Sequence, residues 1–216
     1  MGFGLLLFGY LMLTDVEVGV SIEHQIGFDV LPNVIGFIIM FFALKQLKSF
    51  YGAFRRAQIS LIPLIAVSGV YLGIEVFSLF GYALSTVSTV LNCMSIVENL
   101  LLLIFHLLLL STAAELAREV DLMPLATSLK KANVVSAVYY SMAFLTLLLF
   151  PFISGIKVIA PFVNLALYLT LFLKFGSFIY NFITLYRCYM YIGYEGETTF
   201  DYYKHPFQKL IEKLKK

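Results

Sequence analysis

The sequence is poor in charged residues. Only 13% of its 216 residues are Asp, Glu, Lys or Arg, whereas an ordinary soluble domain carries about 25%. In their place, 61% of the residues are hydrophobic and the mean hydropathy is +0.91. This composition argues against a soluble domain and predicts an integral membrane protein. The basic residues are spread over separate segments that flank apolar runs, so nucleic-acid binding is not expected.

Cysteine is scarce, tryptophan is missing, and no catalytic motif is evident. Cys93 and Cys188 are the two cysteines, and without a CxxC pattern they predict neither a disulfide framework nor a zinc site. The sequence has no nucleophile elbow, phosphate-binding loop or dinucleotide-binding glycine pattern. We therefore expect no enzymatic activity, no cofactor and no bound metal. Tyrosines near the end of the last apolar run take the interfacial place that tryptophan often has.

Long apolar runs are what the sequence has in abundance. They cover Phe3–Leu13, Val30–Leu44, Ile59–Leu84, Thr89–Leu110, Val134–Phe152 and Ile159–Tyr186. A spanning helix needs about 20 apolar residues, so the last four runs are long enough and the first two are short. We expect an all-α, polytopic transmembrane bundle of about six helices. The first two either extend into the polar stretch between them or form a re-entrant hairpin.

Basic residues mark one side of the membrane. Of the 15 Lys and Arg residues, all but Lys157 and Lys174 follow the second, fourth or sixth apolar run. Cytoplasmic loops carry an excess of Lys and Arg, so we expect these segments and both termini to be cytoplasmic.

Two polar segments lie on that expected cytoplasmic side. Residues 113–133 are expected to continue the fourth helix and to turn near Pro124. Residues 195–216 are expected to form an amphipathic, basic tail after a transmembrane domain of residues 1–194. The expected partners are membrane lipids, through the basic tail, and a membrane subunit or cytoplasmic protein, through either segment.

Three ionisable side chains interrupt the apolar runs. Glu75, Glu98 and Lys174 each lie between apolar residues, and such a side chain at bilayer depth costs about 2.5–3.5 kcal/mol on insertion scales. Their estimated depths bring them within reach of one another, so we expect a Glu–Lys–Glu cluster inside the bundle. Polar residues recur beside them at helical spacing. The candidate ligand-binding residues are Glu75, Glu98, Lys174, Tyr71, Asn99, His106, Asn164 and Asn181.

Two interpretations of this cluster stay open. In the first, the protein is a transport or ligand-binding protein that holds a small polar or cationic ligand, or protons, in an intramembrane cavity. In the second, it is a structural or regulatory subunit, and the charges pair only to fix the register of the helices. A membrane enzyme is a distant third interpretation. Gly69 and Gly73 form a GxxxG pattern opposite the polar face, which predicts a close helix neighbour there.

The N-terminal part carries a resemblance to a known group of proteins. Its motifs are Gly4-Leu-Leu-Leu-Phe-Gly-Tyr, Gly27-Phe-Asp-Val-Leu-Pro-Asn-Val-Ile-Gly-Phe and Leu44-Lys-Gln-Leu. They resemble small multi-spanning membrane proteins of Firmicutes-type bacteria that have no assigned activity, although Asn33 stands where that signature has Asp. The resemblance implies a bacterial cytoplasmic (inner) membrane. In size, helix number and sidedness the chain is also similar to the substrate-binding subunits of energy-coupling-factor vitamin transporters.

Overall fold

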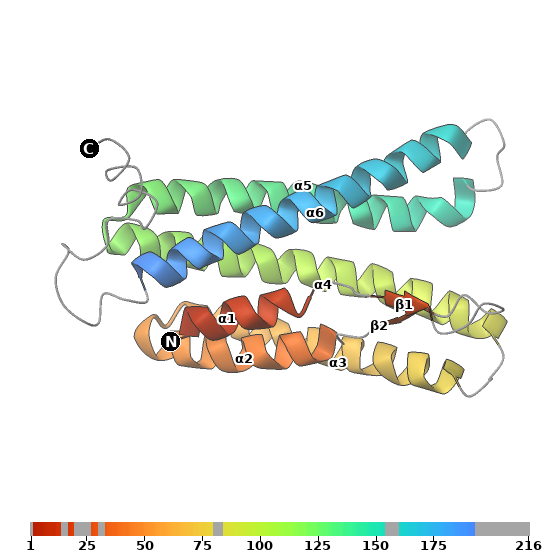
Figure 1. Ribbon diagram of the computed structural model, residues 1–216, viewed down its shortest axis with the longest axis horizontal. Helices are drawn as coiled ribbons and strands as arrows, with labels where there is room; N and C mark the ends of the chain where they lie inside the picture. The colour runs from red at the N-terminus through yellow and green to blue at the C-terminus, as the bar shows by residue number, and fades with distance from the viewer. Residues whose placement is uncertain are drawn as a thin grey trace, which may run out of the picture.

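The computed structural model describes residues 2–13, 17–19, 27–29, 33–79, 84–153 and 160–192. In this part of the chain the elements are α1 (Gly2–Leu11), β1 (Glu17–Gly19), β2 (Gly27–Asp29), α2 (Asn33–Phe50), α3 (Phe54–Leu79), α4 (Leu84–Glu119), α5 (Met123–Ile153) and α6 (Ala160–Tyr191) (Figure 1). The helices α2 to α6 are long and apolar enough to cross a membrane, and α1 is a shorter apolar helix. The predicted helical, multi-pass membrane protein is confirmed to this extent.

The helices form a closed ring. Each helix packs against the next one in sequence, and α6 returns to contact α1. Figure 1 shows α3 to α6 running along most of the molecule, whereas α1 and α2 occupy only one half of its length. We call the end where α1 begins, and where α2 and α6 end, the basal end, and the opposite end the distal end. All the described helices therefore enclose the basal half, whereas α1 and α2 are missing from the distal half.

The first two helices form an antiparallel pair with both outer ends at the basal end (Figure 1). Because α1 ends at Leu11 and a strand begins at Glu17, the helices do not extend into the polar stretch between them. Instead, β1 and β2 pair antiparallel within it, with Glu17 opposite Asp29. The expectation of a purely helical chain did not include this strand pair. Helix α2 also continues to Phe50, beyond the predicted end at Leu44.

Glycines set a very close approach of α1 to α2. A Cβ atom added at Gly9 would lie 2.8 Å from the carbonyl oxygen of Gly36, and one added at Gly36 would lie 2.8 Å from the carbonyl oxygen of Gly9. The predicted seam at Gly69 and Gly73 is wrong. Among the described residues, a Cβ at Gly73 meets nothing within 4 Å, and one at Gly69 meets only a methyl group of Val34 at 4.0 Å. A GxxxG pattern allows a close neighbour but does not bring one.

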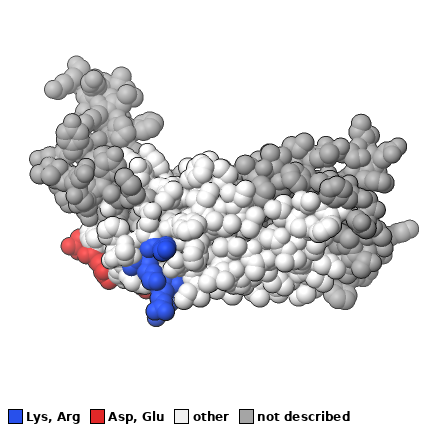
Figure 2. Space-filling model, turned by 90° about the horizontal axis from the view of Figure 1, so that it is seen from below, with Lys and Arg blue, Asp and Glu red and all other residues white. Residues whose placement is uncertain are grey.

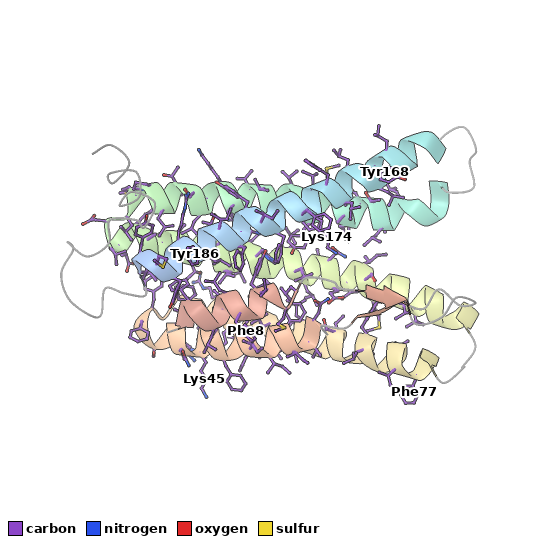
Figure 3. The ribbon with its side chains drawn as sticks, viewed as in Figure 1. Phe8, Lys45, Phe77, Tyr168, Lys174 and Tyr186 are labelled. Carbon is purple, nitrogen blue, oxygen red and sulfur yellow. The ribbon has the colours of Figure 1, made fainter. Side chains whose placement is uncertain are left out.

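The hydrophobic core lies in the basal half. Among the described residues, the largest fully buried side chains come from α1 and α2 or from the basal parts of the longer helices; they include Leu6, Phe37, Leu61, Phe105, Leu129 and Leu185. Toward the distal end, Phe77 and Tyr168 are 66% and 72% exposed, and Figure 3 labels both near that end. Exposed apolar side chains are normal on a surface that faces lipid, because lipid tails are as apolar as leucine.

Charged side chains gather at the basal end. Figure 2 shows Lys and Arg together with Asp and Glu at that end, and no charged residue over the rest of the described surface on this face. As predicted for residues 113–133, α4 continues to Glu119, the chain turns at Val120–Leu122, and Pro124 lies in the first turn of α5. The predicted tail, residues 195–216, lies outside the described residues.

Candidate ligand-binding cavity

A cavity of about 620 Å³ lies inside the ring of helices. Sites for small ligands typically measure about 300–1,000 Å³, so its size suits a small molecule. Side chains from every one of the described helices line it; one from each, in chain order, are Tyr10, Phe37, Tyr71, Asn99, Tyr140 and Lys174.

The short length of α1 places this cavity. Its ten residues rise about 15 Å, so it closes the ring between α2 and α6 only in the basal half. The lining includes Tyr10 near the end of α1, Leu13 in the turn that follows it, and Asn33 and Val34 from the start of α2. The cavity therefore begins where α1 ends, at the boundary between the packed basal half and the more open distal half.

Four of the predicted site residues line this cavity together: Tyr71, Glu98, Asn99 and Lys174. They come from α3, α4 and α6, and all four are half-buried. Figure 3 labels Lys174 near the middle of α6. The sequence argument that intramembrane charges turn toward the bundle interior is therefore confirmed for Glu98 and Lys174.

Hydrogen bonds hold two of these polar side chains on α4. The Ser68 hydroxyl of α3 donates to Oε1 of Glu98 at 2.6 Å, which ties the carboxylate to the neighbouring helix. The side-chain amide of Asn99 donates to the Ser95 carbonyl, one turn earlier, at 2.9 Å. The side-chain oxygen of Asn99 is the acceptor that this amide group has for other partners.

His106 is buried beside the cavity rather than in its lining. Its Nδ1 lies 2.9 Å from the Leu102 carbonyl oxygen. Because a carbonyl only accepts, Nδ1 carries the proton of the neutral ring and Nε2 is the acceptor. The hydroxyls of Tyr10 and Tyr140, both of which line the cavity, lie 3.3 and 3.5 Å from Nε2. The histidine thus orients two tyrosines of the cavity wall.

Asn181 completes this polar network from α6. It is 1% exposed, and its amide donates to the Tyr10 hydroxyl at 3.0 Å and to the Ser136 hydroxyl at 2.7 Å. Ser136 in turn lies 3.5 Å from the hydroxyl of Ser177, another residue of the lining. His106 and Asn181, both predicted as ligand-binding residues, are therefore one layer behind the cavity surface.

Aromatic rings stiffen the same wall. Tyr10 stacks on Phe178 with ring centroids 5.2 Å apart and an interplanar angle of 10°. The His106 ring lies 4.8 Å from the Tyr140 ring and 5.6 Å from the Tyr10 ring. The stacked rings and the hydrogen bonds of His106, Tyr10, Ser136 and the Asn181 amide nitrogen fix the basal wall of the cavity, although Oδ1 of Asn181 is buried without a hydrogen-bond partner among the described residues.

Two predicted site residues cannot be placed in the cavity. The side chains of Glu75 and Asn164 lie outside the described residues, although the backbone of both positions is helical, in α3 and α6. Of the predicted Glu–Lys–Glu cluster, Glu98 and Lys174 line the same cavity, and the contact of the three charges with one another stays a prediction. Glu75 follows Tyr71 by one helical turn toward the distal end, where the ring has fewer members.

Sequence reasoning missed Tyr10 and Asn33 as site residues. Tyr10 lies at the end of the first apolar run, where a tyrosine is most simply explained by the membrane interface. Its neighbour Gly9 was the available signal, because a glycine brings another helix close. Asn33 was recognised as part of a motif, but its place at the start of α2 gave no sign that it faces a cavity.

The cavity offers hydrogen-bond donors and acceptors, one carboxylate and one ammonium group, which suits reversible recognition of a polar molecule. Among the described residues no three His, Cys, Asp or Glu side chains gather as metal ligands would. Comparison with known proteins supplies no relative: no family model, curated protein or solved structure matches this chain.

Proposed function

We propose that this is a membrane transport or ligand-binding protein that holds a small polar or cationic molecule in the central cavity without changing it chemically. The observation that carries the proposal is the cavity of about 620 Å³ that both Glu98 and Lys174 line. Inside a membrane an ionisable side chain is retained only where it faces a partner, water or a ligand. Two such side chains on one cavity of ligand size support a binding role.

The lining favours a ligand that carries an amino or ammonium group. A carboxylate can accept about four hydrogen bonds at once, so Glu98 can contact a ligand in addition to its protein partners, which include Ser68. Tyr10, Tyr71 and Tyr140 add aromatic faces, which attract cations. The Lys174 ammonium group suits a carboxylate or another acceptor elsewhere on the ligand. Small amines and zwitterions fit this chemistry, and a proton on Glu98 is the smallest cation that it allows.

We further propose that the basal end faces the cytoplasm of a bacterial cell and that the bundle lies in the cytoplasmic membrane. The exposed basic residues of the described chain gather at the basal end; they are Lys45, Lys48, Arg55, Arg56, Arg118, Lys130, Lys131 and Arg187. An excess of Lys and Arg is typical of the cytoplasmic side. The resemblance of the N-terminal motifs to bacterial membrane proteins supports the same assignment.

A structural or regulatory subunit is the second candidate function. The hydrogen bond from Ser68 to Glu98 favours this function, because a carboxylate that is bonded to a neighbouring helix can have a purely structural role, that of fixing helix register. In that case the cavity lining contributes to folding, and replacing Glu98 changes stability without changing the affinity for any ligand.

The two functions separate in a ligand-stabilisation experiment. The full-length protein in detergent is heated with ethanolamine, glycine betaine or lysine, and the melting temperature is followed. We expect at least one of these amines to raise it, since a ligand that binds only the folded state stabilises that state. Glu98→Gln should abolish this rise. Glu115→Gln, at an exposed position further along α4, should preserve it. No rise with any amine, or an equal loss in both variants, would support the structural role.

A further inference from the structure

A shallow, open groove lies on the surface between α5 and α6 near the basal end. It measures about 510 Å³ and is lined by Thr127, Lys130, Lys131, Val134, Val135 and Tyr180. It shares none of these residues with the central cavity. Five of its six lining residues recur along one side of α5, and Tyr180 faces them from α6. We call it the α5–α6 groove.

The sequence of α5 places this groove at the level of the membrane interface. Lys130 and Lys131 are the last charged residues before an uninterrupted run without charge, from Ala132 to Ile153. Both lysines are exposed, while Val135 is half-buried. Lysines that border a spanning segment extend their ammonium groups toward the lipid headgroups. The groove therefore has two positive charges at headgroup level and an apolar wall directly beneath them.

From this arrangement we propose that the α5–α6 groove binds one anionic phospholipid. Its phosphate lies between the ammonium groups of Lys130 and Lys131, and one of its acyl chains runs along Val134 and Val135. Basic pockets between spanning helices on the cytoplasmic side are suited to anionic headgroups. The hydroxyl of Thr127 donates to the Met123 carbonyl at 3.0 Å, so the lysines supply the donors for the phosphate.

Charge and apolarity together select this occupant. A free phosphate would use the two lysines but leave the wall formed by Val134 and Val135 without a contact. The C-terminal tail, residues 195–216, carries five lysines against four acidic residues, so it offers no net negative charge to the groove. An anionic lipid complements both parts of the site.

The basal end offers a matched control for a merely diffuse attraction. Lys45 and Lys48 of α2 are also exposed, also lie at the basal end, and line neither the groove nor the central cavity. An attraction that depended only on the net charge of this end would lose as much from this pair as from the pair in the groove.

The experiment counts lipids bound to the intact protein. Full-length protein in detergent is mixed with phosphatidylglycerol or with phosphatidylcholine of the same acyl chains, and bound lipids are counted by native mass spectrometry. We expect one phosphatidylglycerol to remain bound and to raise the melting temperature, with no comparable effect of phosphatidylcholine. The double variant Lys130→Gln/Lys131→Gln should bind phosphatidylglycerol about tenfold more weakly or worse. Lys45→Gln/Lys48→Gln should bind it as the unmodified protein does.

Several results would overturn the proposal. Equal losses in the two double variants would mean diffuse attraction, and equal binding of phosphatidylcholine would mean that charge is not recognised. A stabilisation by inorganic phosphate that matches the effect of phosphatidylglycerol would mean an anion site without a lipid. The melting temperature of each variant without lipid is the folding control, and because both lysine pairs are exposed we expect it to stay unchanged. The Glu98→Gln variant should keep the lipid, since its cavity is separate.

Discussion

The two halves of this bundle are built from the same kinds of residues but packed differently. In the basal half, six helices surround side chains such as Leu61, Phe105 and Leu185, each 0% exposed. In the distal half α3 to α6 continue without α1 and α2, and none of the large side chains described there is fully buried. The difference comes from α1 and α2, which fill only the basal half (Figure 1). A ring of helices needs enough members to keep lipid or water out of its interior. Because α1 is short, the packed core ends where α1 ends.

This comparison explains where the polar residues can lie. In the basal half each buried polar side chain of the network has a neighbour close enough for a hydrogen bond, as His106 and Asn181 show. At the boundary, the space left beyond Tyr10 is lined by Glu98 and Lys174. If Glu98 and Lys174 lay one turn further into the core, they would lack room. If they lay on the outer wall of the bundle, they would face lipid. The boundary is the position that accommodates them.

The close contact of α1 with α2 should be the most sensitive point of the basal half. Gly9→Val places a Cβ about 2.8 Å from a backbone oxygen of α2, which no side-chain rotation relieves, so we expect a loss of about 3 kcal/mol in stability. Gly73→Val is the matched control in α3. Within the described part of the chain its Cβ meets nothing within 4 Å, and we expect no loss. Thermal unfolding in detergent measures both, and equal melting temperatures would refute the distinction between the halves.

The buried polar network should be the next most sensitive feature. Asn181→Ala removes the donor to Tyr10 and Ser136 and leaves two buried hydroxyls less satisfied, so we expect a loss of about 2 kcal/mol. Tyr10→Phe should lower the stability less in the Asn181→Ala variant than in the unmodified protein, because the two residues share a hydrogen bond. The double-mutant cycle, measured by unfolding in detergent, gives this coupling. Strictly additive losses would mean that the network does not act as a unit.

The turn between α4 and α5 offers a prediction of the opposite sign. Asp121 has a positive φ of 57°, and the Leu122 amide donates to the Ala117 carbonyl at 2.8 Å, as in a helix C-cap that favours glycine. A left-handed conformation costs a non-glycine residue about 1–2 kcal/mol. We expect Asp121→Gly to raise the stability by about 1 kcal/mol in the same unfolding assay. The neighbouring Val120→Gly should lower it, and stabilisation by both would point to a cause other than backbone strain.

The sequence anticipated those features that a membrane penalises strongly. Glu98 and Lys174 had to face the interior, because lipid cannot satisfy a charge, and they do line one cavity. The long helices followed from the length and apolarity of their segments. The features that it did not anticipate depend on which helices meet. Gly9 and Gly36 contribute one glycine from each helix, a pairing that no pattern within either helix displays.

The same reasoning explains the positions of His106 and Asn181. Both are polar residues on the predicted interior faces, and hydropathy alone does not distinguish a side chain that lines a cavity from one that is hydrogen-bonded behind it. The short strand pair was missed because β1 and β2 have only three residues each, too few for an alternating pattern to be recognised.

The smallest effect is expected at the outermost contact of the basal end. The Tyr51 hydroxyl donates to Oε1 of Glu119 at 2.9 Å, which joins the α2–α3 turn to the end of α4 and raises the pKa of the Tyr51 phenol above its usual range. The contact is exposed to solvent and screened, so Tyr51→Phe should cost about 0.5 kcal/mol or less. Because the neutral phenol is the form that is stabilised, this contribution persists at neutral pH and is lost as the pH rises above about 10. Unfolding of both proteins at pH 7 and pH 11 measures it. We expect the difference in stability between the two proteins to be small at pH 7 and to vanish at pH 11. A difference that grows with pH would contradict the assignment. A difference this small means that the stability of the basal half comes mainly from its packed interior and not from its charged rim.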